Sequence, residues 1–463
     1  MAITVTNTNT LTLLNIINRT SALQSDTLTR MSTGKKINAG KDNPAGLIAL
    51  KALDADYIAT NAALDNNQRT NAMLSKADAD LTEVSNLLSQ IETLVASSVG
   101  DQLSDSEKAA NQAQIDSAIE SIDRIIRTSK FNGKGLLNGQ LAIQTSHTGG
   151  KAEDIRLYTR NPGSTSTTLT VNVTSASSAA MFSTTNSATG AVQLTITGKL
   201  GSATVDLAAS DDRSAEITKI NAVKALTGVS ATTGTGNGIK FATTEKGSDE
   251  FITIDIISGG GSDGWVDQTV QNGADAVLTV NGQSAAADGN KVTFNTNGIS
   301  GSFTLTSTGD AAGSFTISVS GGGATFQLGT DASTRSTIGL SSLFSNNLGK
   351  QGTGYLNELK SGGAQQLLGS GTNQLQIVKE AMQMVAEAQG RIGGFQKYQV
   401  QTAINSLQAT QKSLADAKSV IEDVDYATET AELNRQSVLM QSAISLLGLA
   451  NQQSSLVLSL LGR

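Results

Sequence analysis

The chain has 463 residues with a formal net charge of −7 at pH 7, contains no cysteine, and is only 3% aromatic. An acidic chain without clustered Lys and Arg is not expected to bind nucleic acid or an anionic membrane, and without cysteine it forms no disulfide and uses no thiol in catalysis. The length predicts several domains, whose cores must be built mainly from Leu, Ile, Val and Ala.

A helix is expected within the first forty residues. Apolar side chains recur there at helical spacing between Thr, Asn and Ser. No Lys or Arg precedes Arg19, so the segment does not have the form of a cleaved secretory signal peptide. The apolar positions are Leu13, Ile16, Ile17, Ala22, Leu23, Leu28 and Met31.

Two more helices are expected between Ala45 and Thr128. The first has apolar residues at alternating spacings of four and three, which is the pattern of a coiled-coil seam. Ser104 and Glu107 carry the signature of a capping box at the start of the second. Phe131-Asn132-Gly133 ends that helix. The predicted seam is Leu74, Ala77, Leu81, Val84, Leu88, Ile91 and Val95, and the predicted buried face of the second helix is Ile115, Ala118, Ile122 and Ile125.

From Pro162 to about Gly349 the composition shifts to Thr, Ser, Gly and Ala with alternating Val, Leu, Ile and Phe, which is typical of half-buried strands separated by turns. One helix is expected at Ala215–Leu226, between two pairs of strands. The region holds one domain or two, with a candidate break at residues 259–264. Strands are expected at Leu169–Val173, Gln193–Thr197, Phe251–Ile256, Val277–Val280, Val292–Phe294, Phe303–Leu305, Phe315–Val319 and Thr325–Leu328.

The helical pattern returns at Leu375 and continues to Ile421, with Gly390, Gly393 and Gly394 as candidate points of close packing or bending. The last stretch, Gln436–Gly462, has no charged residue, and Gln and Asn interrupt it too often for a membrane span. Two adjacent apolar stripes exceed what one partner helix covers, so the two chain ends are predicted to pair and then to pack against other subunits. The stripes are Leu439, Ala443, Leu446, Ala450, Val457, Leu460 and Met440, Ile444, Leu447, Leu458, Leu461.

Two polar segments near the ends match motifs of one known family. Ser32–Gly46 resembles the bacterial flagellin motif SGxxINxxxDxxAG, with Thr33 in place of Ser, and Ile421–Glu429 resembles the family motif IxDxDYAxE. The closing helix is also similar, and the resemblance covers about the first 160 and the last 115 residues. The matched positions are Gly34, Ile37, Asn38, Asp42, Ala45, Gly46, Asp423, Asp425, Tyr426 and Ala427.

The resemblance implies a multidomain α plus β fold. The N- and C-terminal coiled-coil layers would pair into a rod that carries a central, β-rich (α+β) insert. It places a terminal helical core layer at residues 1–42 and 421–463, and an α-helical rod layer at residues 43–162 and 345–420. The rod layer would include a β-hairpin near Leu141–Tyr158, and residues 163–344 would form the variable outer insert.

The resemblance also implies function. The chain would be a structural subunit, not an enzyme, that leaves the bacterium by type III export without a cleaved signal peptide and polymerises into the extracellular flagellar filament for motility. Expected partners are identical subunits, an export chaperone at the C-terminal helix, and hook-associated and cap proteins, with no nucleic acid, no membrane insertion, no cofactor and no metal. The residues expected to carry assembly are Leu13, Ile16, Ile17, Leu23, Leu28, Leu439, Ile444, Leu446, Leu447, Val457, Leu460 and Leu461.

Two alternatives remain open at this point: a hook-filament junction protein, and a filament subunit whose insert acts as an adhesin. A metal site is disfavoured, because helix caps and interfacial salt bridges explain Asp42, Asn43, Asp423 and Asp425 at least as well. The zinc protease motif HExxH of some flagellin inserts is not available either, because His147 is the single histidine of the chain.

Overall fold

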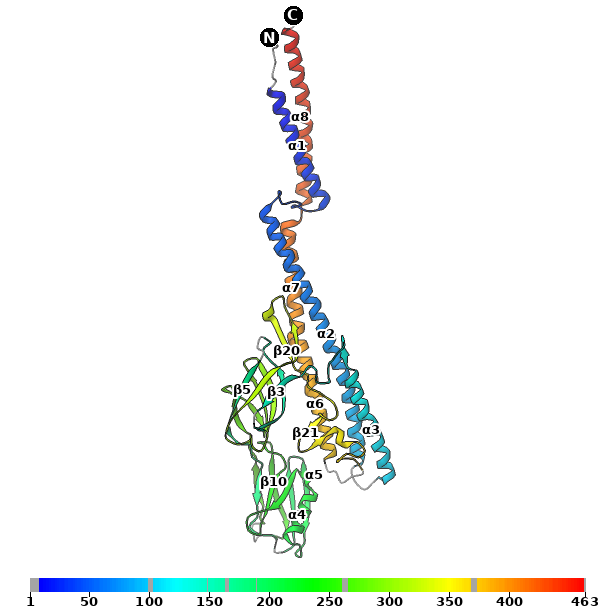
Figure 1. The fold of residues 1–463 in the computed structure, drawn as a ribbon, viewed down its shortest axis with the longest axis vertical. Helices are drawn as coiled ribbons and strands as arrows, with labels where there is room; N and C mark the ends of the chain where they lie inside the picture. Colours follow the sequence, from blue (N-terminus) through cyan, green and yellow to red (C-terminus); the bar gives the residue numbers. More distant parts are fainter. Residues whose placement is uncertain are drawn as a thin grey trace. The chain divides into compact units, whose positions relative to one another are not determined.

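The computed structural model describes residues 8–98, 103–147, 149–162, 166–188, 190–259, 265–367 and 373–461, the last eight of these by their backbone only (Figure 1). The chain divides into two compact units. We call residues 1–65 with 404–463 the terminal unit, and residues 66–403 the central unit. Helices α2 (Pro44–Ser98) and α7 (Gln401–Glu422) begin in one unit and end in the other.

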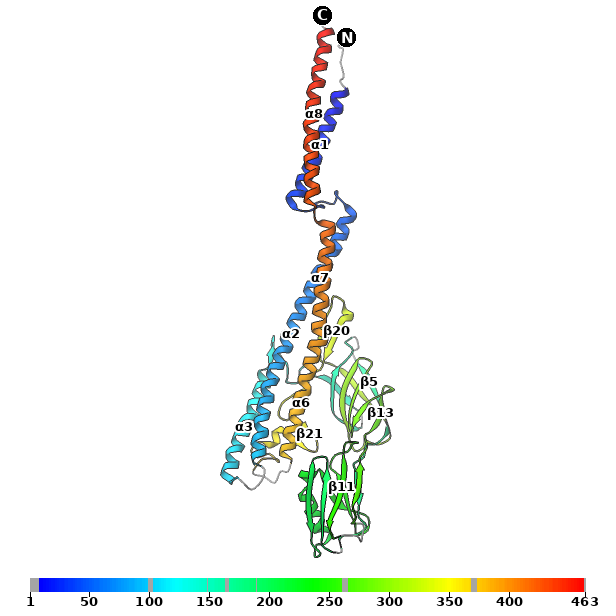
Figure 2. The same cartoon turned by 180° about the vertical axis from the view of Figure 1, so that it is seen from behind.

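The described residues of the terminal unit are helical apart from its turns and one isolated β-bridge. Helix α1 (Thr8–Thr33) lies beside helix α8 (Tyr426–Leu461), and the two opposite views in Figures 1 and 2 both show them side by side. The start of α2 is joined to the end of α7 by side chains, including a hydrogen bond of 2.7 Å from Lys418 Nζ to Asp54 Oδ1. The predicted pairing of the two chain ends is therefore confirmed.

Three long helices form one part of the central unit: α2, α3 (Asp105–Thr128) and α6 (Gln374–Phe395) (Figure 2). All seven predicted seam residues of α2 are fully buried. The capping box is present, since Ser104 Oγ accepts from Glu107 N and Glu107 Oε2 accepts from Ser104 N. The buried face of α3 differs in part from the prediction, because Ile119 and Ile126 are fully buried while Ala118 and Ile125 are half-buried.

Helix α6 continues through its glycines, and these glycines bring no other described element close. The helix continues through Gly390, Gly393 and Gly394, and no described atom from elsewhere lies within 4 Å of a Cβ built at any of them. A single π-helical turn, η3 (Gln396–Val400), follows before α7 begins. The predicted close packing at these glycines is therefore not observed among the described residues.

The β-rich region contains two separate apolar cores. The first core lies between a five-stranded sheet of order β14-β13-β5-β18-β3 and a four-stranded sheet of order β15-β16-β17-β4. Its strands are β3 (Ile143–His147), β4 (Ala152–Thr159), β5 (Thr167–Ser175), β13 (Val277–Val280), β14 (Gln283–Ser284), β15 (Ala286–Asp288), β16 (Lys291–Thr296), β17 (Ile299–Leu305) and β18 (Gly313–Gly322).

The hairpin expected near Leu141–Tyr158 is not formed. Strand β3 pairs with β18 and strand β4 pairs with β17, so the two neighbours in sequence enter different sheets. A hairpin of two isolated strands is marginally stable in water, whereas these strands bury Ile143 and Leu157 in the first core. Both strands therefore pack with the insert.

The second core is one excursion of the chain between β5 and β13. A four-stranded sheet of order β12-β11-β7-β8 and a three-stranded sheet of order β6-β10-β9 enclose it, together with two short helices. Its elements are β6 (Met181–Ser183), β7 (Val192–Gly198), β8 (Gly201–Leu207), α4 (Arg213–Ala222), α5 (Lys224–Thr227), β9 (Val229–Thr233), β10 (Ile239–Thr243), β11 (Phe251–Ser258) and β12 (Gln268–Asn272).

The excursion is closed where it begins and ends. Ser178 N donates to Ala274 O at 2.8 Å, and Ala274 N donates to Ser178 O at 3.0 Å. The middle of the chain thus holds two cores, and the boundary between them lies at this pair of residues. The predicted break lies elsewhere, at residues 259–264, most of which fall outside the described residues.

The remaining elements are short. All eight predicted strands are present, and the predicted helix at Ala215–Leu226 corresponds to α4 and α5. After α3 the chain turns at Asn132 and Gly133, which both have positive φ as a type I′ hairpin requires. The short elements are β1 (Lys130–Phe131), β2 (Lys134–Gly135), β19 (Ala324–Gln327), η1 (Ala332–Thr334), β20 (Arg335–Ile338), β21 (Gly349–Lys350), β22 (Gly354–Tyr355) and η2 (Leu356–Leu359).

Candidate functional site

Helices α1 and α8 form an antiparallel pair with a regular seam. Arg30 contacts Glu429 and Gln24 contacts Ser437. Residue numbers therefore increase along α8 in the direction in which they decrease along α1. The buried and half-buried residues of each helix recur at alternating spacings of four and three, as in a coiled coil. The seam residues are Leu13, Ile17, Thr20, Gln24, Thr27 and Met31 on α1, and Glu429, Leu433, Gln436, Met440, Ala443, Leu447 and Ala450 on α8.

The middle of this seam is polar or small. Thr27 and Gln436 are 3% and 4% exposed, and Thr20 and Ala443 are similarly buried. Gln436 donates from Nε2 to Glu432 Oε1 at 2.9 Å, while its Oε1 has no hydrogen-bond partner among the described residues. Such a seam buries little apolar surface, so the pair gains little stability from its own contact.

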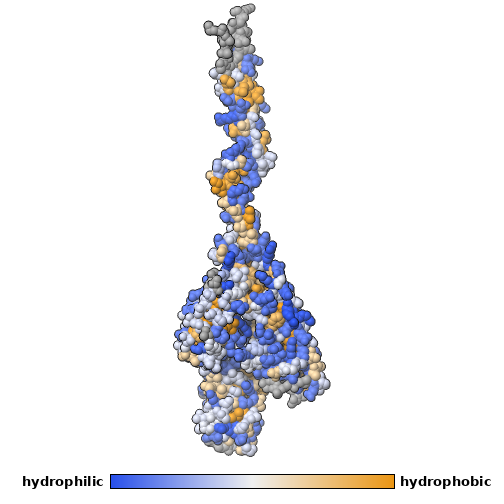
Figure 3. Space-filling model, viewed as in Figure 1, coloured by the Kyte–Doolittle hydropathy of each residue, from blue (hydrophilic) through white to orange (hydrophobic). Residues whose placement is uncertain are grey.

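Large apolar side chains lie on the outside of the same pair. Ten of them are between 45% and 62% exposed among the described residues, and Figure 3 shows orange side chains between blue ones along these helices. Fully burying one Leu or Ile contributes about 1.5–3 kcal/mol, so covering what these ten expose would contribute on the order of 10 kcal/mol. We call this set the apolar rim: Leu11, Leu14, Ile16, Leu23, Leu28, Val438, Leu439, Ile444, Leu446 and Leu449.

The structure divides the predicted assembly residues between seam and rim. Leu13, Ile17 and Leu447 are half-buried in the seam. The two predicted stripes of α8 do not correspond to two faces, because the seam takes Met440 and Leu447 from one stripe and Ala443 and Ala450 from the other. Ile16, Leu23, Leu28, Leu439, Ile444 and Leu446 belong to the rim, and the side chains of Val457, Leu460 and Leu461 lie outside the described residues.

The two motif segments meet where both helix pairs are interrupted. Lys36 N donates to Glu422 O at 2.6 Å and Val424 N donates to Gly34 O at 3.1 Å, which makes a short antiparallel bridge between the turn from α1 to α2 and the turn from α7 to α8. Lys35 also forms an ion pair with the buried Glu422. We call this contact the junction. The junction joins the α1–α2 turn to the α7–α8 turn by backbone hydrogen bonds as well as by an ion pair.

The motif acids and amides organise the turns of the junction. Asp42 Oδ2 accepts hydrogen bonds from Ala39 N at 2.8 Å and Asn38 N at 3.0 Å, and these bonds lower the pKa of Asp42 below its usual value. Asn43 Oδ1 caps α2 by accepting from Gly46 N at 2.9 Å.

Asp425 does the same for α8. It accepts from Thr428 Oγ1 at 2.8 Å and from Ala427 N at 3.0 Å, and its pKa is lowered by these two bonds. Asp423 accepts from Ser419 Oγ at 2.5 Å. These contacts fit the predicted role of the acids as caps, and no group of three potential metal ligands occurs in the described part of the chain.

The motif glycines and the tyrosine fill the space between these turns. Gly34 has φ of +70°, which favours glycine, and a Cβ there would lie 3.3 Å from the Tyr426 hydroxyl, which donates to Met31 O at 3.1 Å. Ile37 is buried and its Cδ1 would lie 2.7 Å from a Cβ on Gly46. The motif alanines Ala45 and Ala427 are exposed, and nothing in the structure explains them.

Sequence reasoning missed the polar members of the seam. Thr20 and Thr27 lie seven residues apart, and so do Glu422, Glu429 and Gln436, all five being buried. A search for heptad spacing that included polar residues would have found both series, whereas a search restricted to apolar residues mixes the rim with apolar seam residues such as Leu13, Ile17 and Leu447.

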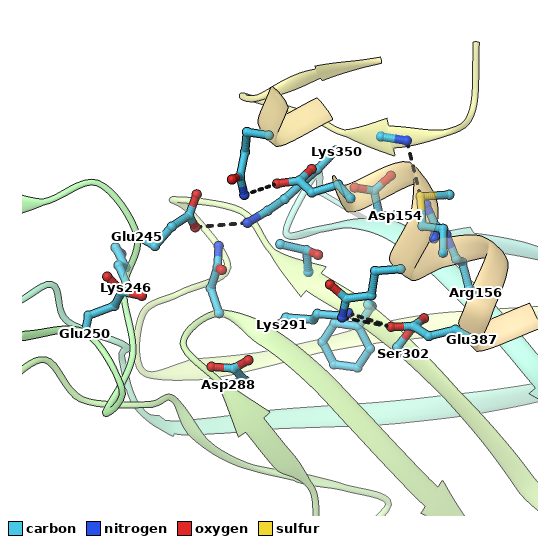
Figure 4. A pocket seen from close by; sticks show the side chains of 18 of the residues that line it. Asp154, Arg156, Glu245, Lys246, Glu250, Asp288, Lys291, Ser302, Lys350 and Glu387 are labelled. Atoms are coloured by element: carbon cyan, nitrogen blue, oxygen red, sulfur yellow. Dashed lines mark hydrogen bonds and ion pairs between the residues drawn. The ribbon is translucent and has the colours of Figure 1, made fainter. Parts of the chain in front are cut away.

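The central unit also has a hollow, which lies between the two cores and α6 (Figure 4). Its charges are largely paired, with Lys350 Nζ 3.0 Å from Glu245 Oε2 and Lys291 Nζ 3.1 Å from Glu387 Oε1. Burial raises the pKa of Glu380, which also lines the hollow. Acids and bases alternate around it, so its lining favours no class of ligand.

Comparison with known proteins places these features in one family. The family model "Bacterial flagellin N-terminal helical region" matches residues 5–142, and "Bacterial flagellin C-terminal helical region" matches residues 375–461. The chain is 28% identical to a flagellin of Salmonella rubislaw over 99% of both chains, and 26% identical to polar flagellin F of Vibrio parahaemolyticus over 100% of both.

Solved structures give weaker matches. The flagellar hook-associated protein-3 of Legionella pneumophila aligns with a TM-score of 0.28 and 12% identity, over 83% of this chain and 99% of that one. FliC from Burkholderia pseudomallei aligns with a TM-score of 0.24 and 15% identity, over 72% of this chain and 99% of that one. TM-scores of this size support no inference about the chain. Within the described residues, no helix has the length and apolar character needed to cross a membrane.

Proposed function

Because this chain belongs to the bacterial flagellin family, we propose that it is the structural subunit of a flagellar filament and polymerises by burying the apolar rim of α1 and α8 against neighbouring copies. The observation that carries the proposal is the distribution of apolar residues in the terminal unit. The most buried residues in the middle of the seam are polar or small, whereas ten large apolar side chains face outward. A partner must supply the remaining burial.

The magnitude supports identical subunits as that partner. Ordering a residue costs about 1–2 kcal/mol in backbone entropy, and an isolated helix pair recovers little of it through a seam whose most buried positions include Thr27, Gln436 and Ala443. The order of 10 kcal/mol available from the rim becomes accessible only when other helices cover it. Folding of the terminal unit is therefore coupled to docking at the filament end.

We further propose a division of the subunit into three layers. Residues 1–42 and 421–463 form the inner layer, which carries assembly, and residues 43–162 with 345–420 form the rod layer. Residues 163–344 form the outer layer. Strands β3 and β4 are assigned to the outer layer as well, because they pair with β18 and β17 of the first core.

An exposed rim also needs protection before assembly. Large apolar patches on a soluble chain favour aggregation, and half of the rim belongs to α8, so a chaperone that covers α8 until export by the type III route fits this surface. Hook-associated and cap proteins are the partners at the two ends of the filament. The location of the assembled subunit is extracellular, and no cleaved signal peptide or cofactor is required by this scheme.

The test is seeded elongation of the purified full chain, followed by negative-stain electron microscopy. Deleting residues 436–463 should abolish elongation while the second core stays folded, which the fluorescence of the only tryptophan, Trp265, reports because that residue is buried there. A finer variant replaces Leu439 and Leu446 of the rim by Gln. Its matched control replaces the exposed Ser442 and Ser445 of the same helix by Gln.

The outcomes are distinct. Loss of elongation in the rim variant but not in the control supports the proposal. Elongation of the truncated chain at the normal rate would overturn it. A wild-type chain that binds to seeds and stops would instead fit the hook-filament junction alternative.

A further inference from the structure

We propose that the ion pair between Arg30 and Glu429 determines which helix α8 pairs with, by selecting α1 of the same chain in a single register. The inference rests on the assembly function proposed above and names a specificity determinant within it. The apolar rim would drive assembly, and this ion pair would set the pairing on which assembly depends.

The geometry of the pair is that of a partly buried ion pair in a seam. Arg30 Nη1 lies 3.2 Å from Glu429 Oε1, and the side chains of Arg30 and Glu429 are 36% and 11% exposed. Glu429 lies in the first turn of α8, where its backbone N–H donates to Asp425 O. In the described part of the chain no other base forms an ion pair with Glu429.

The pair belongs to a series in which charges are divided between the two segments. Glu422, Glu429 and Gln436 are buried at intervals of seven residues on the C-terminal segment. Lys35 pairs with Glu422, which also lies 3.6 Å from Lys418 of its own segment, and Arg30 pairs with Glu429, so the N-terminal segment supplies a base to each acid. The next level is uncharged, with Gln24 Nε2 donating to Ser437 Oγ at 3.3 Å.

A rim of Leu, Ile and Val cannot choose its partner, because apolar contact is not directional. If α8 slid along α1 by one heptad, Glu429 would come opposite Leu23 in one direction and would lie beyond the end of α1 in the other, instead of facing Arg30. Pairing of two copies of α8 would also leave Glu429 without a base, because the only base among the described residues of α8, Arg435, is already bound to Glu432. Removing the partner of a buried charge is strongly unfavourable, so each wrong pairing is penalised.

Charge reversal in the full chain tests the assignment. Arg30→Glu and Glu429→Arg alone should each slow seeded elongation about tenfold, which corresponds to about 1.4 kcal/mol and is modest because Arg30 is partly exposed. The double variant should restore elongation to within about threefold of wild type. The matched control reverses Asp26 and Lys41, an exposed ion pair within the N-terminal segment that does not join it to α8, and should leave elongation unchanged.

A second measurement does not depend on elongation. The chain has no native cysteine, so Gln24→Cys with Ser437→Cys provides a single reporter pair at positions whose side chains are hydrogen-bonded. Oxidation should give an intramolecular disulfide, seen as a shift in gel mobility. Adding the nearly isosteric Glu429→Gln should reduce its yield several-fold, and oxidation of Gln24→Cys with Ile444→Cys, one heptad away, should then become detectable.

Each outcome decides the question. Normal elongation of both single variants, or no rescue by the double variant, would overturn the proposal. Rescue by mixing the Arg30→Glu chain with the Glu429→Arg chain would overturn its intramolecular part, because the pair would then form between copies. If wild type does not elongate at all, the filament function fails, while the cysteine pair still reports whether Glu429 sets the register.

Discussion

Gly46 gives a test of the junction in which helix propensity and packing predict opposite signs. It is the third residue of α2, and replacing a helical glycine by alanine ordinarily stabilises by about 0.5–1 kcal/mol. Here, a Cβ would lie 2.6 Å from Asn43 Nδ2 and 2.7 Å from Ile37 Cδ1. Asn43 caps the helix through the Gly46 N–H and Ile37 is buried, so neither side chain can move without loss.

The packing effect should win. Losing the cap costs about 1 kcal/mol and overpacking a buried site about 1–3 kcal/mol, so the net effect of Gly46→Ala is a loss of about 2 kcal/mol. If the terminal unit melts cooperatively, that loss lowers its melting midpoint by about 5–10 °C.

Thermal depolymerisation of filaments, followed by far-UV circular dichroism and light scattering, measures this change. The control is Gly390→Ala in α6, where no described atom from elsewhere lies within 4 Å of the added Cβ, and it should leave the midpoint unchanged or raise it. If Gly46→Ala raised the midpoint as Gly390→Ala does, the contacts of Asn43 and Ile37 would not constrain the junction, and the reasoning would be wrong.

Three further predictions concern the second core and the α8 cap. Phe241→Ala removes a fully buried ring that lies 6.2 Å from the Trp265 ring, and should destabilise the second core by about 3–5 kcal/mol in urea denaturation followed by Trp265 fluorescence, without slowing elongation. Burial raises the pKa of Glu216, so the folded state binds its proton more tightly than the unfolded state. The second core should therefore gain stability as the pH falls from neutral through that raised pKa, and Glu216→Gln should abolish this gain in the same assay. Asp425→Ala removes the α8 cap and should destabilise filaments by about 1 kcal/mol in thermal depolymerisation, and an unchanged midpoint would contradict the capping role.

Local patterns predicted the elements of this chain well. The seam from Leu74 to Val95 repeats over several heptads and is buried wholly within the chain, so the apolar pattern and the observed burial coincide. The capping box at Ser104 and the alternating strands are also local signals. The wrong hairpin at β3 and β4 has the opposite cause, since their true partners β17 and β18 lie more than a hundred residues further along the chain.

The terminal unit shows a different limit. An apolar pattern reports all the burial that a helix will ever experience, including burial by other molecules, so Leu439 and Leu446 gave the stronger signal although they are exposed in the chain. The most buried positions of the intramolecular seam include Thr27 and Gln436, which a search for apolar spacing does not select. If neighbouring copies cover the rim as proposed, pairing within a chain and pairing between chains are superimposed in one sequence pattern.

The contact between Ser178 and Ala274, which we call the neck of the second core, also has a consequence for how such chains can vary. Because the polypeptide leaves and re-enters the first core at two residues that exchange backbone hydrogen bonds, everything between them can be lengthened, shortened or exchanged while the strands on either side keep their positions. Joining the neck by a tight turn would need only a few residues. The residues between Ser178 and Ala274 thus form an exchangeable segment. A foreign domain whose two ends lie side by side could replace this segment and would then be displayed on every copy of the subunit.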